Sequence, residues 1–278
     1  MRKRVLFSAT LLLTCVSVSM AAPGGTETKG TASSLTAAQI VEKNVQARGG
    51  LTAWRAVHSL EMKGKMDAGG NNRPTIPVPG VRKAAAAPQR PAEQVKLPFV
   101  MDLERGRKQR VEIEFNGQTA VQVYDGKQGW KLRPFLNRHD VEKYTPEELQ
   151  AAATESDLDG LLIDYAAKGS QVELQGVDQV EGHKAYNLKV TDKAGHSRHV
   201  WVDAENFLDI KIEGTPRRLD GKYRPVATYL HDYRAVNGLM MPYLLETVVE
   251  GYKDKEQIQI ESIVSNPKLD ESRFAIPR

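Results

Sequence analysis

Apolar positions near the start of the folded part of the chain recur with the period of an α-helix. In residues 37–48 they fall at helical spacing: Ala37, Ile40, Val41 and Val45. Thr36 and Gln39 have the spacing of a capping box, and Gly49-Gly50 supplies a helix stop. We therefore predict a helix over 36–48, followed by a short helical turn over 51–57 in which Trp54 anchors the core.

From Ser59 onward the period changes to two, which is typical of strands with one apolar and one polar face. Asn116-Gly117, Asp125-Gly126 and Asn237-Gly238 are tight-turn sequences between such segments. Because short turns join neighbouring strands antiparallel, we predict a meander rather than a parallel α/β fold. The alternating positions lie in 60–66, 99–103, 111–115, 121–123, 172–174, 186–190, 200–202, 210–212, 226–233, 241–249 and 258–260.

A helical insert separates two runs of predicted strands. Residues 146–153 suggest one short helix. Residues 157–168 suggest a second helix, with Ser156 as its cap and Gly169 at its end. Its single apolar stripe consists of Leu158, Leu161, Leu162 and Tyr165. A helix with this stripe would cover the apolar face of a sheet.

Residues 69–94 interrupt the first run of strands with a sequence rich in Pro, Gly, Asn and Ala. Proline removes donors from a sheet ladder, so we predict a long mobile loop between two strands. A partner-binding role for this loop is the alternative.

The first 21 residues have the layout of a secretory signal peptide. Arg2, Lys3 and Arg4 precede an apolar run, and a small-x-small cleavage pattern ends at Ala21. Cleavage there would follow export of the protein across a membrane, and would leave a flexible leader over 22–35 before one domain over 36–278. The sequence ending at Cys15 also resembles a lipobox, so a lipid anchor on Cys15 is the alternative.

Removal of the signal peptide changes both charge and thiol content. The chain has 39 Lys and Arg against 35 Asp and Glu, and residues 1–21 hold three basic residues and no acidic one, which leaves 36 against 35. The pI of about 9.0 is therefore weak support for nucleic-acid binding. The only cysteine, Cys15, would also be lost, so the mature chain would have no disulfide and no thiolate metal site.

Motifs that carry catalysis are absent from the sequence. It contains no GxSxG, HExxH, GxxxxGK[ST] or GxGxxG. His196 and His199 lie three apart in a predicted strand, which directs their rings to opposite faces and disfavours a metal site. Asp157 and Asp159 are explained by the start of the second insert helix. We therefore expect no catalytic residue, no metal and no cofactor.

The order of these parts resembles the periplasmic outer-membrane lipoprotein-sorting and carrier family, the LolA/LolB-like proteins. The likeness covers residues 36–278, and the Pro-rich segment 69–94 is longer than the family pattern needs. It also rests on five phrases: IVEKNVQARGG, VYDGKQGW, VELQGVDQVEGHKAYNLKVT, VWVDAENFLDIKIEG and NPKLDESRFAIPR.

The resemblance implies a mainly β fold with α, an incomplete curved antiparallel β-barrel whose concave face is covered by helices. It also implies an apolar cavity between sheet and helices that accepts acyl chains. No binding motif transfers from the family, so alternation alone selects the expected cavity residues. They are Phe99, Met101, Val111, Ile113, Phe115, Val121, Val123, Trp130, Leu158, Leu161, Leu162, Tyr165, Leu188, Trp201, Tyr243 and Leu245.

The expected function is a periplasmic binding protein or carrier for lipid or lipoprotein acyl chains. Its expected partners are a lipid or acylated lipoprotein, envelope donor and acceptor proteins, and transiently a membrane, but no nucleic acid. The alternative is a non-catalytic envelope structural or protein-interaction module with a filled barrel. A hydrolase ranks last, because the sequence shows no nucleophile–base pair.

Overall fold

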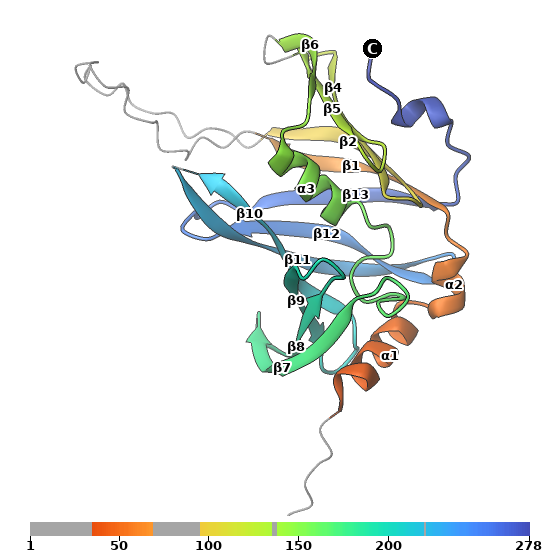
Figure 1. The fold of residues 1–278 in the computed structure, drawn as a ribbon, viewed down its shortest axis with the longest axis vertical. Helices are drawn as coiled ribbons and strands as arrows, with labels where there is room; N and C mark the ends of the chain where they lie inside the picture. Colours follow the sequence, from red (N-terminus) through yellow and green to blue (C-terminus); the bar gives the residue numbers. More distant parts are fainter. Residues whose placement is uncertain (1–34, 69–94, 135–137, 220) are drawn as a thin grey trace, which may run out of the picture. The chain divides into compact units, whose positions relative to one another are not determined.

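Thirteen antiparallel strands form one open sheet among the described residues of the computed structural model (Figure 1). The structure describes residues 35–68, 95–134, 138–219 and 221–278. The predicted signal peptide, the leader up to residue 34 and the Pro-rich segment 69–94 lie outside these residues. The expected mainly β fold, an open curved antiparallel sheet accompanied by helices, is confirmed.

Two meanders meet in the middle of the sheet. Its order is β6-β5-β4-β3-β2-β1-β13-β12-β11-β10-β9-β8-β7, so β1 (Ser59–Ala68) pairs with β13 (Glu256–Ser265). The two edges are β6 (Arg138–Lys143) and β7 (Gln171–Val180). The chain between these edges, α3 (Pro146–Glu155) and residues 156–170, therefore leads from one side of the sheet to the other.

Apart from β5 and β6, the remaining strands contain the predicted alternating segments, and the three predicted tight turns join neighbouring strands. β6 was not predicted, because its sequence RHDVEK offers a single apolar residue and no alternation. The other strands are β2 (Val95–Glu104), β3 (Lys108–Phe115), β4 (Gln118–Tyr124), β5 (Gly129–Arg133), β8 (His183–Thr191), β9 (Ser197–Asp203), β10 (Asp209–Leu219), β11 (Lys222–Val236) and β12 (Leu239–Val249).

Helix α1 (Ala37–Ala47) begins with the predicted capping box. The Gln39 amide donates to Thr36 Oγ1 at 3.3 Å, and Gln39 Oε1 accepts from the Thr36 amide at 2.9 Å. Helix α2 (Leu51–Arg55) follows directly, and its Trp54 is fully buried, as predicted for a core anchor. The indole of Trp54 donates to the Arg48 carbonyl at 3.0 Å, which fixes α2 against the end of α1.

One face of the sheet packs against α1, α2 and residues 158–163, and we call it the covered face. Its opposite is the outer face. Because α3 and residues 156–170 connect the two edge strands, the chain itself supplies part of this cover (Figure 1). Buried residues that the strands contribute to the covered face include Leu60, Phe99, Leu103, Leu188, Val190, Val200, Val202, Leu239, Met241, Tyr243, Ile260 and Ile263.

The predicted helix over 157–168 is wrong, because residues 158–169 form consecutive turns. Gly160 and Asp164 have left-handed φ angles of 73° and 54°, which interrupt a right-handed helix. Leu162 and Ile163 are both 1% exposed, and a helix with a single apolar stripe would not bury two consecutive residues equally. Ser156, the expected cap of this helix, instead ends α3.

The acidic residues of this segment serve tertiary ion pairs rather than a helix start. Asp159 accepts two hydrogen bonds from Arg105, at 2.8 and 2.9 Å. Asp157 pairs with Lys168 at 2.9 Å. The apolar side chains of the segment still cover the sheet, but these ion pairs and turns shape its backbone.

Candidate functional site

An apolar row crosses five adjacent strands on the covered face. Consecutive cross-strand pairs join Leu97 on β2 to Met66 on β1, Met66 to Ile258 on β13, Ile258 to Leu245 on β12, and Leu245 to Leu230 on β11. Directly paired residues of antiparallel strands project from the same face of the sheet. The five side chains therefore form a continuous apolar stripe, which we call the apolar row.

The middle of the apolar row is less buried than its ends. Leu97 and Leu230 are each 8% exposed, whereas Met66, Ile258 and Leu245 are only half-buried. Further along the same strands Leu60 and Leu239 are 1% and 2% exposed. The covers thus seal one part of the face and leave apolar surface accessible at the row. Adjacent apolar surface that remains accessible is typical of a ligand-binding site.

Two cavities flank the turns of residues 158–169. One cavity of about 210 Å³ lies between α3, Leu161 and strands β8–β10. The other, of about 370 Å³, lies between these turns and the first two helices, and its apolar lining includes Val41, Val45, Leu51, Leu162 and Tyr165. The segment therefore fills the space beside it incompletely, which leaves room for its displacement.

By contrast, a buried polar network fixes α1 to the sheet. Asp209 of β10 accepts from the Asn44 amide group at 2.9 Å, and its other oxygen lies 3.4 Å from Arg48 Nη1. Asn44 is fully buried and also donates to the Phe207 carbonyl at 2.8 Å. Burial raises the pKa of Asp209, against the opposing charge of Arg48 and the hydrogen bond from Asn44. Moving α1 would expose this network, so α1 is the fixed part of the cover.

Most of the residues expected in the cavity share the covered face, either in its core or packed against that core. They are Phe99, Met101, Ile113, Leu158, Leu161, Leu162, Tyr165, Leu188, Tyr243 and Leu245. Val111 and Phe115 lie on the same face of β3 as Ile113, half-buried and outside that cluster. The sequence analysis did not single out Met66, Ile258, Leu230 or Leu97 for the site, although the first three lie within its alternating segments.

Val121, Val123 and Trp130 do not belong to this face, so their predicted place in the cavity is wrong. On β4 the covered face carries Ala120, the cross-strand partner of Ile113, and successive residues of a strand alternate between faces. The three residues therefore project from the outer face. There they form a separate buried cluster with Phe274, from the C-terminal 3₁₀ helix Glu271–Phe274.

Trp201 also projects from the outer face, which corrects its predicted position. Its neighbours Val200 and Val202 are buried in the core, so Trp201 must point the other way. The indole donates to Asp178 Oδ2 at 2.7 Å, and Lys211 Nζ lies 4.1 Å from the ring centroid. A tryptophan can lie on either face of a sheet. The positions of Val200 and Val202 in β9 place Trp201 on the outer face.

His196 and His199 have separate carboxylate partners. His196 Nδ1 lies 3.3 Å from Asp192, and His199 Nδ1 lies 2.7 Å from Glu213. The two histidines therefore pair with different carboxylates, from the β8–β9 turn and from β10.

Among solved structures, proteins with the same architecture are found at low sequence identity. No family model and no curated protein sequence matches the chain. A LolA-superfamily protein from Nitrosomonas europaea is similar with a TM-score of 0.55 and 13% identity, over 87% of this chain and 98% of that one. This chain has a LolA-like fold.

Two further structures extend the LolA-like comparison. A DUF1329 family protein from Desulfovibrio piger has a TM-score of 0.54 and 12% identity, covering 87% of this chain and 98% of that one. A domain from Vibrio parahaemolyticus assigned to outer membrane lipoprotein sorting has a TM-score of 0.50 and 9% identity, covering 85% and 94%. At these identities the likeness establishes the LolA-like fold alone. None of the helices among the described residues is long and apolar enough to cross a membrane.

Proposed function

We propose that this protein is a periplasmic binding protein that carries the acyl chains of a lipid or lipoprotein in the bacterial envelope. The observation that carries the proposal is the apolar row, five cross-strand neighbours whose middle members remain half-buried on the covered face of a LolA-like sheet. The lipoprotein-sorting assignment of the Vibrio parahaemolyticus domain supports the same class of ligand.

Simple energetics fit a carrier. Moving an acyl chain of about sixteen carbons through water exposes methylenes at about 0.8 kcal/mol each, or about 13 kcal/mol in total. Sheltering it requires roughly 500 Å² of apolar surface at about 25 cal/mol per Å². Such shelter needs apolar side chains and no catalytic group, and the proposal requires residues 158–169 to move aside, because the half-buried row alone exposes less area than this. We accordingly propose binding without catalysis, and no cofactor.

Uptake and release require two states of different affinity, and the covers differ in how firmly they are held. The network around Asp209 ties α1 to the sheet through buried groups. Residues 158–169 are not helical, are flanked by cavities, and are held by two side-chain ion pairs, from Arg105 to Asp159 and from the 59% exposed Arg55 to Asp164. We propose that residues 158–169 move to admit the chain, while α1 stays in place.

The test is a matched pair of arginine variants on opposite faces of β13. Ile258 lies in the apolar row, whereas Val264 is 44% exposed and pairs with Glu61 on the outer face. Displacement of a fluorescent fatty acid from the purified protein measures acyl binding. Ile258→Arg should weaken binding by at least about tenfold, because the guanidinium would be desolvated by the ligand. Val264→Arg should bind as the unmodified protein does.

Native mass spectrometry of protein purified from the periplasm tests the same proposal without a probe. A co-purifying lipid or acylated peptide is expected on the unmodified protein and on Val264→Arg, but not on Ile258→Arg. Absence of any acyl ligand from all three, together with no fatty-acid binding, would favour the filled envelope module instead.

A further inference from the structure

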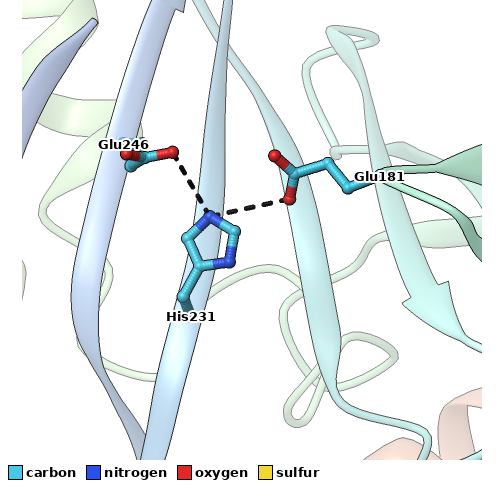
Figure 2. A group of neighbouring side chains, drawn as sticks. All are labelled: Glu181, His231 and Glu246. Atoms are coloured by element: carbon cyan, nitrogen blue, oxygen red, sulfur yellow. Dashed lines mark ion pairs between the residues drawn. The ribbon is translucent and has the colours of Figure 1, made fainter.

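A histidine and two glutamates from three separate elements converge on the outer face (Figure 2). His231 lies on β11, Glu246 on the adjacent β12, and Glu181 in the turn between β7 and β8. His231 pairs with Leu244 and Glu246 with Tyr229, so the two side chains are diagonal neighbours on one face. In the sheet order, strands β9 and β10 separate β8 from β11. The turn between β7 and β8 nevertheless extends over these two strands, so that Glu181 lies beside His231 on β11 and Glu246 on β12.

The imidazole nitrogen between the carboxylates accepts or donates no hydrogen bond within the described part of the chain. His231 Nε2 lies 3.6 Å from Glu181 Oε2 and 3.6 Å from Glu246 Oε2, as the dashed lines in Figure 2 mark. These separations are too long for hydrogen bonds. The nitrogen is shielded from solvent and has no hydrogen-bond partner among the described residues. Buried polar atoms are normally hydrogen-bonded, so an unpartnered imidazole nitrogen requires an explanation, and a bound ion is one.

The distances from His231 Nε2 to the two carboxylate oxygens are closer to those between ligands of one metal ion than to hydrogen-bond distances. A tetrahedral ion with bonds of about 2.0 Å to nitrogen and oxygen holds its ligand atoms roughly 3.3 Å apart. Closing 3.6 Å to that value requires a shift of a few tenths of an ångström. The three donor atoms all lie within 4.8 Å of one another, and Glu181, whose side chain is 41% exposed, can supply the larger movement.

We propose that Glu181, His231 and Glu246 bind one divalent transition-metal ion, with Zn²⁺ as the natural occupant. Imidazole nitrogen and carboxylate oxygen are both ordinary zinc ligands, and water would complete a tetrahedral set. The ion would fasten the β7–β8 turn to β11 and β12. It lies on the face opposite the apolar row, so this inference does not depend on acyl binding.

Lys255 is the internal competitor for this site. Its Nζ donates to Glu246 Oε2 at 2.9 Å, and Gln257 donates to the other oxygen at 2.6 Å. The Lys255 side chain is 47% exposed and can swing into solvent when an ion binds. Zn²⁺ and the two carboxylates would then form a neutral set.

The experiment is a zinc titration of the untagged full chain by isothermal calorimetry near neutral pH. A Cys15→Ser background removes the only thiol. The unmodified site should take up one equivalent, and His231→Gln and Glu181→Gln should each weaken binding by at least about tenfold. Lys255→Met should tighten it, because the competing cation is gone. His199→Gln, on the same face but paired with Glu213, is the control and should bind zinc normally.

Zinc should also raise the melting temperature of the parent protein and of His199→Gln, but not that of His231→Gln. Thermal unfolding without metal shows whether each variant is folded before it is titrated. The proposal is overturned if neither the parent nor Lys255→Met shows saturable binding. It is equally overturned if His231→Gln, when folded, binds zinc as tightly as the parent.

Discussion

Arg105 and Asp159 join the β2–β3 turn to the segment that crosses the covered face. Nη1 and Nη2 of Arg105 donate to the two carboxylate oxygens of Asp159 at 2.8 and 2.9 Å. The same guanidinium donates to the carbonyls of Trp54 and Val57, beside α2. Asp159 is only 5% exposed. One side chain thus connects the sheet, the second helix and residues 158–169, and it substitutes for the helical backbone that this segment lacks.

Replacing Arg105 should destabilise the fold. Arg105→Met leaves the buried carboxylate of Asp159 without its partner, and we expect a loss of about 2–3 kcal/mol in the free energy of unfolding. Asp159→Asn should cost less, and a double-mutant cycle should show strong coupling between the two positions. Urea unfolding provides the measurement. Arg55→Met, which removes the exposed pair with Asp164, should change stability little, and equal losses at Arg55 and Arg105 would contradict the assignment.

A close backbone approach explains why α1 ends in glycine. Gly49 has a φ of 112°, and a Cβ atom there would collide with the carbonyl oxygen of Gly238 in the β11–β12 turn. Gly49→Ala should therefore reduce the free energy of unfolding by about 3 kcal/mol. Gly117→Ala is the matched control, since Gly117 has a φ of 72° and open space around it. It should lose only about 1 kcal/mol, and a loss equal to that at Gly49 would show that the collision contributes nothing.

Local chemistry made much of the fold predictable. The capping box at Thr36 and Gln39 and the turns at Asn116-Gly117 and Asn237-Gly238 depend on neighbouring residues alone, and all three occur as expected. The prediction of a helix over 157–168 was wrong because the apolar spacing of this segment is compatible with either a helix or a series of turns. In the structure Gly160 and Asp164 adopt left-handed φ angles, and the distant Arg105 and Arg55 bind Asp159 and Asp164 in these turns.

The residues of the candidate site could not be predicted fully, because the spacing of apolar residues does not show the register of a strand or which distant strands pair. Trp130 and Trp201 are apolar residues on strands, and only register assigns them to the outer face. The apolar row joins five strands, two of them from opposite ends of the chain. The group of Glu181, His231 and Glu246 likewise requires the sheet to bring a turn over two other strands.

The buried carboxylate of Asp209 gives a pH-dependent stability with a defined sign. Burial raises its pKa above the ordinary value of 3.8, despite the opposing effects of Arg48 and Asn44. Its stabilising contribution is therefore complete below pH 3.8 and is lost as the pH rises through the folded-state pKa. The free energy of unfolding of the parent, minus that of Asp209→Asn, should fall as the pH rises above 3.8. Chemical unfolding across this range is the measurement, and a difference that grows with pH would refute the assignment.

Processing of the N-terminus determines whether the protein is free or lipid-anchored. If the signal peptide is cleaved after Ala21, intact mass and N-terminal sequencing should show a chain that begins at Ala22. Cys15→Ser should then leave the mature mass and the location unchanged. A mature protein that begins with a lipid-modified Cys15, and that Cys15→Ser releases from the membrane, would establish the anchored alternative.

Chain length should matter if acyl groups lie along the apolar row. Leu245 pairs with both Ile258 and Leu230, so an indole at this position would occupy the middle of the row. Leu245→Trp should weaken binding of long fatty acids by about tenfold and of short ones by much less, since only long chains extend past the blocked position. Displacement assays over a series of chain lengths measure this. Val264→Trp on the outer face is the control, and an equal loss at all lengths for Leu245→Trp would place the acyl chain elsewhere.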